Sequence, residues 1–262
     1  MDLGLKGRVA LVMGASQGLG EAAARQLAAE GAHVVLVARR IEALNTVKAD
    51  IESRGGSAEI HCCDLFDAAS RKTLCERVSE MPRLDVLVAN SGGPAPGMAP
   101  GIDSNVWSSE FDAMVLGLIE VMDAAVVRMK DAGFGRILVI GSSGIVIPIP
   151  KLAVSNTLRS AVGAYVKTLA EQVASFGVTC NMVLPGRVET PRTGAIDRAT
   201  ANALGVTEEE ARRQSMATIP AGRYGRPEEF AAVVTFLASE QAGYVTGSQI
   251  RVDGGAIRSI NA

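Results

Sequence analysis

Residues 9–20 read Val-Ala-Leu-Val-Met-Gly-Ala-Ser-Gln-Gly-Leu-Gly, and this stretch decides the fold. The apolar run Val9–Met13 is typical of a buried strand, and a helical pattern follows from Gly18 to Glu30. Glycines between a strand and a helix let the backbone approach a pyrophosphate, which then lies at the positive end of the helix. The alternative is a glycine turn required by backbone geometry alone. The strand–turn–helix context favours a dinucleotide site, although the spacing is Gly-x-x-x-Gly-x-Gly.

The same alternation of short apolar runs and longer helical patterns continues along the chain. It predicts a single α/β domain over 1–262, a doubly wound parallel sheet with helices on both faces. We expect strands that are apolar throughout because both faces are buried. Thr190–Pro220 is polar and does not follow this alternation of strand and helix patterns, as expected of a substrate lid. Further strands are expected at His33–Ala38, Ala58–Cys62, Val86–Ala89, Ile137–Ile140, Val178–Val183 and Gln249–Val252, and helices at Ile41–Ser53, Trp107–Met129 and Leu158–Val173.

Composition excludes several classes of protein. The 262 residues carry 26 Lys+Arg against 28 Asp+Glu, a net charge of −2 that gives no field for nucleic acid or anionic lipid. The longest uncharged apolar stretch, Ile137–Pro150, is too short to span a bilayer, and the N-terminus meets charge too early for a secretory signal. The four cysteines have no metal-type spacing, and Cys62 and Cys63 are expected to pack rather than react. A cytoplasmic protein without a metal site is the expectation.

The end of the second predicted strand carries the cofactor preference. An NAD site usually places a carboxylate there for the adenosine ribose, whereas this chain has Arg39 and Arg40. The planar guanidinium of Arg39 suits a 2′-phosphate, so NADP(H) is the preferred cofactor and NAD(H) the alternative. The alternative is that Arg39 and Arg40 only begin a solvent-exposed helix and bind no phosphate. Asp64, after the third strand, is placed to accept from the adenine amino group, and Asn90 to Gly93 end the fourth strand at the same sheet edge.

Taken in order along nearly the whole chain, these motifs resemble the short-chain dehydrogenase/reductase family. Ser142 after the fifth strand, Pro185-Gly186 after the sixth, and Val252–Gly255 near the end complete the pattern. The resemblance implies a Rossmann-type fold, a nicotinamide cofactor, and a homotetramer or homodimer built on the two long helices. It places the following residues at the cofactor: Gly14, Ser16, Gln17, Gly18, Leu19, Gly20, Arg39, Arg40, Asp64, Leu65, Asn90, Gly92, Arg159, Pro185, Gly186 and Val188.

The chain departs from the family at the catalytic signature, a Ser with a Tyr-x-x-x-Lys pair and a helix Asn. Ser142 aligns with the family's serine. Ser155 stands where the tyrosine is expected, Arg159 where the lysine is expected, and Met114 at the asparagine. None of Tyr165, Tyr224 and Tyr244 has a lysine four residues later.

The substitutions change what the site can do. In the family, the lysine lowers the pKa of the tyrosine so that its phenol exchanges a proton with the substrate. A serine is too weak an acid for that role, and an arginine keeps the positive charge but relays no proton. We therefore expect Ser142, Ser155 and Arg159 to polarise a carbonyl, with water as the proton source. Ser155 as a helix cap and Arg159 as a surface charge are the alternatives.

The leading prediction for function is an NADP(H)-dependent oxidoreductase that transfers a hydride to or from a small carbonyl or alcohol substrate. The loss of the Tyr/Lys pair leaves two alternatives open. One is a nucleotide-binding sensor or scaffold without turnover, and the other is a non-redox lyase or isomerase on the same fold.

Overall fold

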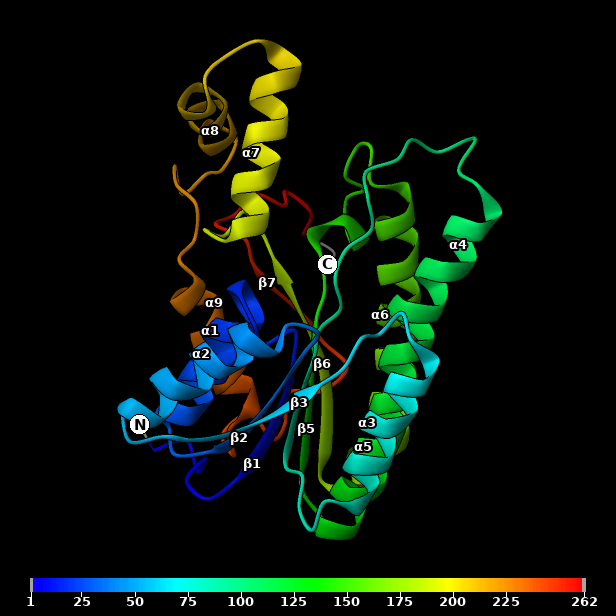
Figure 1. Cartoon of the computed structure of the whole chain (residues 1–262), viewed down its shortest axis with the longest axis vertical. Helices are drawn as coiled ribbons and strands as arrows, with labels where there is room; N and C mark the ends of the chain where they lie inside the picture. Colours follow the sequence, from blue (N-terminus) through cyan, green and yellow to red (C-terminus); the bar gives the residue numbers. More distant parts are fainter. Residues whose placement is uncertain (1, 261–262) are drawn as a thin grey trace.

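The computed structural model describes residues 2–260, in which one parallel sheet of seven strands has the order β3-β2-β1-β4-β5-β6-β7 (Figure 1). The strands are β1 (Val9–Met13), β2 (His33–Ala38), β3 (Ser57–Cys62), β4 (Val86–Ala89), β5 (Gly135–Ile140), β6 (Val178–Pro185) and β7 (Gln249–Val252). The order reverses between β1 and β4, and ligands of open α/β sheets bind at such a switch point, beyond the carboxyl ends of the strands. The predicted fold class is confirmed.

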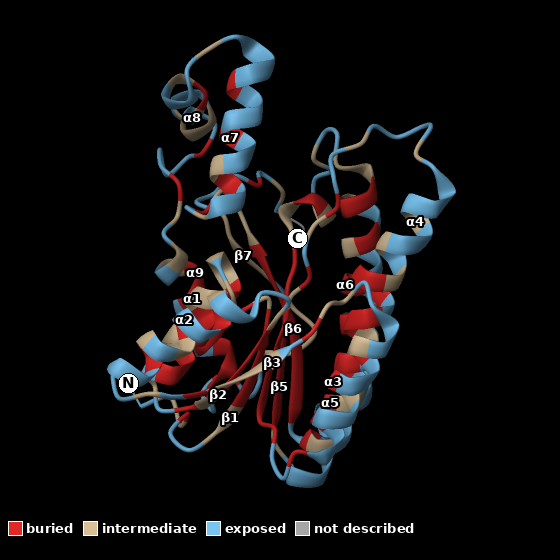
Figure 2. Ribbon diagram, viewed as in Figure 1, coloured by how far each residue is buried: buried red, intermediate tan, exposed pale blue. Residues whose placement is uncertain are grey.

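Helices cover both faces of the sheet and bury a core on each side (Figures 1 and 2). One face carries α1 (Gly18–Ala29), α2 (Ile41–Ser53) and α9 (Pro227–Ala238), and the other carries α3 (Ala68–Glu80), α5 (Gly117–Ala132) and α6 (Ala153–Val173). Alternate residues of β1 serve the two cores: Ala10 and Val12 face the first, Leu11 and Met13 the second. Two sets of helices therefore hold the central strands rigidly from both sides.

The expectation of uniformly apolar strands is wrong at the sheet edges. β3 and β7 are edge strands, and Glu59, His61 and Gln249 are at least partly exposed there. An edge strand has only one neighbour, so its residues meet water. The expectation that both adjacent cysteines pack is likewise half wrong, because Cys63 is buried but Cys62, at the end of β3, is exposed.

The helix expected over 107–129 is longer and irregular. It runs through α4 (Ser104–Phe111), a π-helical turn (Asp112–Leu116) and α5. Buried Arg71 donates to Asp112 at 2.9 Å on this turn and to Glu120 at 3.0 Å beyond it. A Cβ on Gly117 would lie 2.8 Å from the Arg71 side chain, so the small residue makes room for the arginine. Local sequence periodicity does not report such a tertiary contact.

The segment expected to form a lid contains two helices, α7 (Pro191–Leu204) and α8 (Glu208–Ala217), which stand beyond the carboxyl edge of the sheet (Figure 1). Buried Asp197 of α7 connects this segment to residues outside it. Its carboxylate accepts a hydrogen bond from the Tyr224 hydroxyl at 2.9 Å and lies 3.8 Å from the Arg187 guanidinium. Across residues 2–260, no helix is long and apolar enough to cross a membrane, and no cluster of metal-ligating side chains occurs.

Candidate functional site

The glycine turn between β1 and α1 has the geometry of an open anion cradle. Gly14 has a φ of +65°, and the side-chain amide of Asn90 fills the space in which its Cβ would stand. A Cβ on Gly20 would run into the backbone oxygen of Gly14. Gln17, in extended conformation, begins α1 without a side-chain cap, so the first N–H groups of the helix have no side-chain acceptor. This cradle fits a pyrophosphate.

Arg39 and Asp64 lie together at the carboxyl ends of β2 and β3. Arg39 Nη1 is 3.9 Å from Asp64 Oδ2, and both side chains are well exposed. Arg40 is already engaged, because it donates to the Gln17 side chain at 2.7 Å. Arg39 therefore keeps a guanidinium available to an incoming anion, at the place where an adenosine 2′-phosphate would arrive after β2.

Arg159 projects from α6 onto the ends of two central strands. Its guanidinium donates to the carbonyl oxygens of Ile140 at 3.1 Å, Gly92 at 3.2 Å and Ser91 at 3.4 Å. Burial, with a contribution from nearby Arg192, lowers the pKa of Arg159 to about 10, so it remains a cation at neutral pH. The alternative of a surface charge is wrong: Arg159 joins α6 to β4 and β5 at the sheet edge.

Ser155 and Ser142 lie on the elements that flank this cation. α6 begins after Leu152, so Ser155 is inside the first turn and 5% exposed, and the alternative of a helix cap is wrong. Ser142 Oγ accepts the Gly144 N–H at 3.1 Å and keeps its own hydrogen to donate. Asn156 packs over Gly144 and exchanges hydrogen bonds with the Ile149 backbone, which fastens the Ser142 turn to the start of α6.

The hydroxyls of Tyr165 and Tyr224 have carboxylate partners, and Tyr244 is exposed. The Tyr165 hydroxyl donates to the Asp123 carboxylate on α5, and burial together with that hydrogen bond raises the pKa of Tyr165. Tyr224 donates to Asp197 inside the lid, and burial raises its pKa as well. Tyr244 is fully exposed beyond α9. None of the three phenols forms a hydrogen bond with Ser142, Ser155 or Arg159 within residues 2–260.

The remaining sequence-predicted residues line the same edge with varied exposure. Val188 is 4% exposed, so only its backbone could meet a ligand. A Cβ on Gly186 would lie 2.6 Å from Asp253 Cα, which makes this glycine a packing requirement. Leu19 and Leu65 pack against the two cores, Pro185 ends β6, Gly92 offers its carbonyl to Arg159, and the half-buried Ser16 lies within the glycine turn.

Two residues that the sequence did not single out belong to this edge. The Ser91 hydroxyl is buried beside Arg159 and has no hydrogen-bond partner within the described chain. Arg192, in the first turn of α7, lays its guanidinium against Gly93: a Cβ there would be 2.5 Å from Nη2. The only signal for Ser91 in the sequence was weak: it is a serine next to Asn90. The position of Arg192 depends on how the lid folds, which no local sequence pattern indicates.

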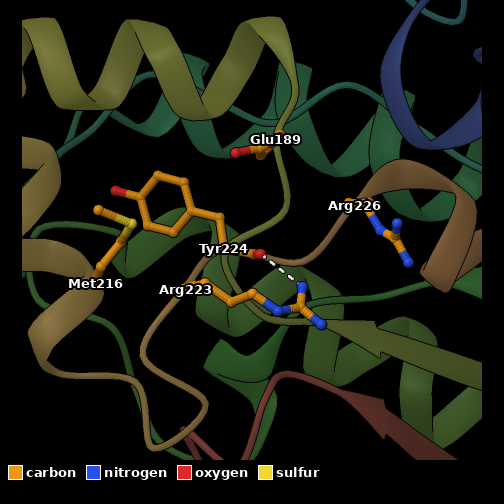
Figure 3. A pocket seen from close by; sticks show the side chains of 5 residues that line it. All are labelled: Glu189, Met216, Arg223, Tyr224 and Arg226. Carbon is orange, nitrogen blue, oxygen red and sulfur yellow. Dashed lines mark hydrogen bonds between the residues drawn. The ribbon is translucent and has the colours of Figure 1, made fainter.

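Two hollows of about 480 and 410 Å³ open within the lid region, and neither is lined by Ser142, Ser155 or Arg159. Figure 3 shows the larger, where Arg223 donates to the Tyr224 carbonyl at 3.0 Å and Met216 lies beside the Tyr224 ring. Three of its five lining side chains are charged, and Glu189 and Arg223 are ion-paired to Arg212 and Glu229. We therefore place the candidate site at the sheet edge, where the glycine turn and Arg159 lie.

Comparison with known proteins gives the family. The profile of the family described as "Enoyl-(Acyl carrier protein) reductase" matches residues 14–256. "Dehydrogenase/reductase SDR family member 4" of Bos taurus is 31% identical, covering 97% of this chain and 88% of the relative. This chain belongs to the short-chain dehydrogenase/reductase family. The "2,3-dihydro-2,3-dihydroxybenzoate dehydrogenase" of Bacillus subtilis is 31% identical, covering 97% of each chain. L-sorbose reductase of Gluconobacter frateurii, solved with NADPH and L-sorbose, superposes with a TM-score of 0.93 at 28% identity, covering 99% of this chain and all of that one.

Proposed function

We propose that this short-chain oxidoreductase uses NADP(H) to transfer a hydride to or from a carbonyl or hydroxyl substrate, through a site in which Ser155 and Arg159 replace the usual Tyr and Lys. The observation that carries the proposal is the placement of Arg159. Its guanidinium is anchored to the ends of β4 and β5, at the sheet edge that also holds Ser142 and the glycine turn.

The residues at this edge fit a dinucleotide phosphate. Gly14 and the uncapped start of α1 would hold the pyrophosphate, Asp64 the adenine, and Arg39 the 2′-phosphate. The solved L-sorbose reductase to which the chain is similar carries NADPH, which supports the same preference here. When bound, the nicotinamide supplies or accepts the hydride.

The chain's own groups would handle the substrate oxygen. Ser142 keeps a hydroxyl hydrogen, and the side-chain hydroxyl of Ser155 has no hydrogen-bond partner within residues 2–260, so both can donate to a carbonyl. The fixed positive charge of Arg159 stabilises the oxyanion that develops as hydride arrives. Because neither a serine nor an arginine is an effective acid at neutral pH, the proton comes from water.

Replacing Arg39 with alanine should weaken NADPH binding about ten- to a hundredfold and leave NADH binding within about twofold, because only the 2′-phosphate loses a charged partner. Calorimetric titration with both nucleotides measures this. The control is Arg54→Ala, since Arg54 pairs with Asp50 at the far end of α2. Equal losses for NADPH and NADH in Arg39→Ala would refute the assignment.

The absence of a Tyr-x-x-x-Lys pair favours one competing function, a nucleotide-binding sensor or scaffold without turnover. It predicts tight NADPH binding with no transfer of hydride to any carbonyl. A non-redox lyase or isomerase would instead form product without change in nicotinamide absorbance. Single-turnover mixing of NADPH-loaded protein with a carbonyl panel distinguishes all three.

The proposal extends to the oligomeric state of the protein, the role of the lid and the cellular location. Val106, Phe111, Leu116 and Val127 expose apolar side chains along α4, the π-helical turn and α5, which suits packing against a second copy in a dimer or tetramer. The lid over Thr190–Pro220 would shape the substrate's surroundings. The cysteines of the described chain are all free, which suits the reducing cytoplasm.

A further inference from the structure

The lid carries one arginine that has no carboxylate partner, and it points to the candidate site. All the other arginines between residues 187 and 226 are paired: Arg187 with Asp197, Arg198 with Glu208, Arg212 with Glu189, Arg213 with Glu210, and Arg223 and Arg226 with Glu229. Arg192 has neither an ion pair nor a hydrogen bond within residues 2–260.

The guanidinium of Arg192 lies against the backbone of Gly93. A Cβ built on Gly93 would lie 2.5 Å from Nη2, 2.7 Å from Nη1 and 2.8 Å from Cζ, so the planar group lies on the glycine backbone just after β4. Gly92, one residue earlier, gives its carbonyl to Arg159. Two guanidiniums from different elements therefore meet at the end of one strand.

Within residues 2–260, neither of these two arginines forms an ion pair with a carboxylate. Arg159 is held by backbone carbonyls alone, and the repulsion from Arg192 adds to burial in lowering its pKa. Like charges near each other in a partly buried site cost free energy unless an anion joins them. A planar guanidinium that is free of protein partners is well suited to bidentate binding of a carboxylate.

We propose that the substrate is an oxo carboxylate, or the corresponding hydroxy acid, whose carboxylate is bound by Arg192 while its reacting oxygen faces Ser142 and Arg159. This rests on the proposed oxidoreductase function and names its substrate class. The cofactor's phosphates are the competing anion, because the lid begins beside their cradle: Thr190 packs 3.4 Å from the position of a Cβ on Gly18. The affinity of the Arg192 variant for NADP⁺ distinguishes the two anions.

Binding can be tested without turnover. Protein saturated with NADP⁺ is titrated calorimetrically with pyruvate, phenylpyruvate, acetoacetate and levulinate, and with the methyl ester of each. We expect at least one acid to bind about ten- to a hundredfold more tightly than its ester. Arg192→Gln should reduce that acid to the affinity of its ester while the NADP⁺ affinity stays within about twofold.

Two further variants sharpen the result. Gly93→Ala should reproduce the loss seen in Arg192→Gln, because the new methyl occupies the place of the guanidinium. Arg198→Gln, which removes an exposed lid arginine paired with Glu208, should change nothing.

Equal binding of acids and esters, binding of none of them, or a loss of NADP⁺ affinity in Arg192→Gln would each overturn the proposal. A failure of the proposed function looks different. In that case the acids bind through Arg192, yet NADPH-loaded protein transfers no hydride to them.

Discussion

Replacing Arg159 with alanine should lower kcat about a hundred- to a thousandfold at saturating NADPH, because the site loses the cation that we place at the developing oxyanion. The guanidinium is held by the carbonyls of Ile140, Ser91 and Gly92, so its position is set before any substrate arrives. Steady-state NADPH oxidation with a reactive oxo acid gives the measurement.

Chemical rescue tests whether the variant loses activity because the positive charge is missing or because the structure of the site has changed. Millimolar guanidinium chloride, far below denaturing concentrations, should restore part of the activity of Arg159→Ala, whereas urea at the same concentration should not. Arg159→Lys should fall between the wild type and the alanine variant, because an ammonium keeps the charge but loses the planar fork. An alanine variant that keeps more than a tenth of the wild-type kcat would remove Arg159 from the mechanism.

The largest effect on stability is expected at Asp85, at the opposite end of the sheet. This 1%-exposed carboxylate accepts from Arg8 at 2.9 Å, from Arg83 at 2.6 Å and from the Val9 N–H at 2.8 Å. Asp85→Ala leaves these donors without their acceptor and should lower the free energy of unfolding by about 3–5 kcal/mol in denaturant titration.

The position of Asp85 in the sheet provides an internal control for this prediction. It precedes β4, at the amino-terminal edge, so NADPH affinity of the folded variant should remain within about twofold. Asp131→Ala, which removes an exposed carboxylate 3.7 Å from Arg128, should change stability by less than about 0.5 kcal/mol. A loss below about 1 kcal/mol in Asp85→Ala would show that water replaces the carboxylate without cost.

The parts of the site that could be predicted from the sequence are those built by local rules. A strand, a glycine turn and a helix start are contiguous, so Gly14 and Gly18 report the cradle by themselves. Arg39 follows β2 directly, and the direction of a parallel strand places it at the ligand edge. The assignment of Ser155 and Arg159 to the catalytic positions rests on family resemblance and stays a prediction.

What escaped prediction depends on contacts between distant segments. The π-helical turn after Phe111 is accompanied by the insertion of Arg71 from α3, far away in the sequence. Arg192 contacts Gly93 because the start of the lid lies against the segment that follows β4. The burial of Ser155 likewise follows from where α6 begins, three residues earlier than a serine cap would require.

Transfer of deuterium tests the central claim most directly. The protein is incubated with an oxo acid and NADPH that carries deuterium at both C4 positions of the nicotinamide, and the product is examined by mass spectrometry. The proposed oxidoreductase gives a hydroxy acid with one carbon-bound deuterium, in excess over the enzyme, and Arg159→Ala gives almost none. Tight NADPH binding without deuterium in any product, across the oxo acids and neutral ketones, would contradict hydride transfer and favour one of the two competing functions.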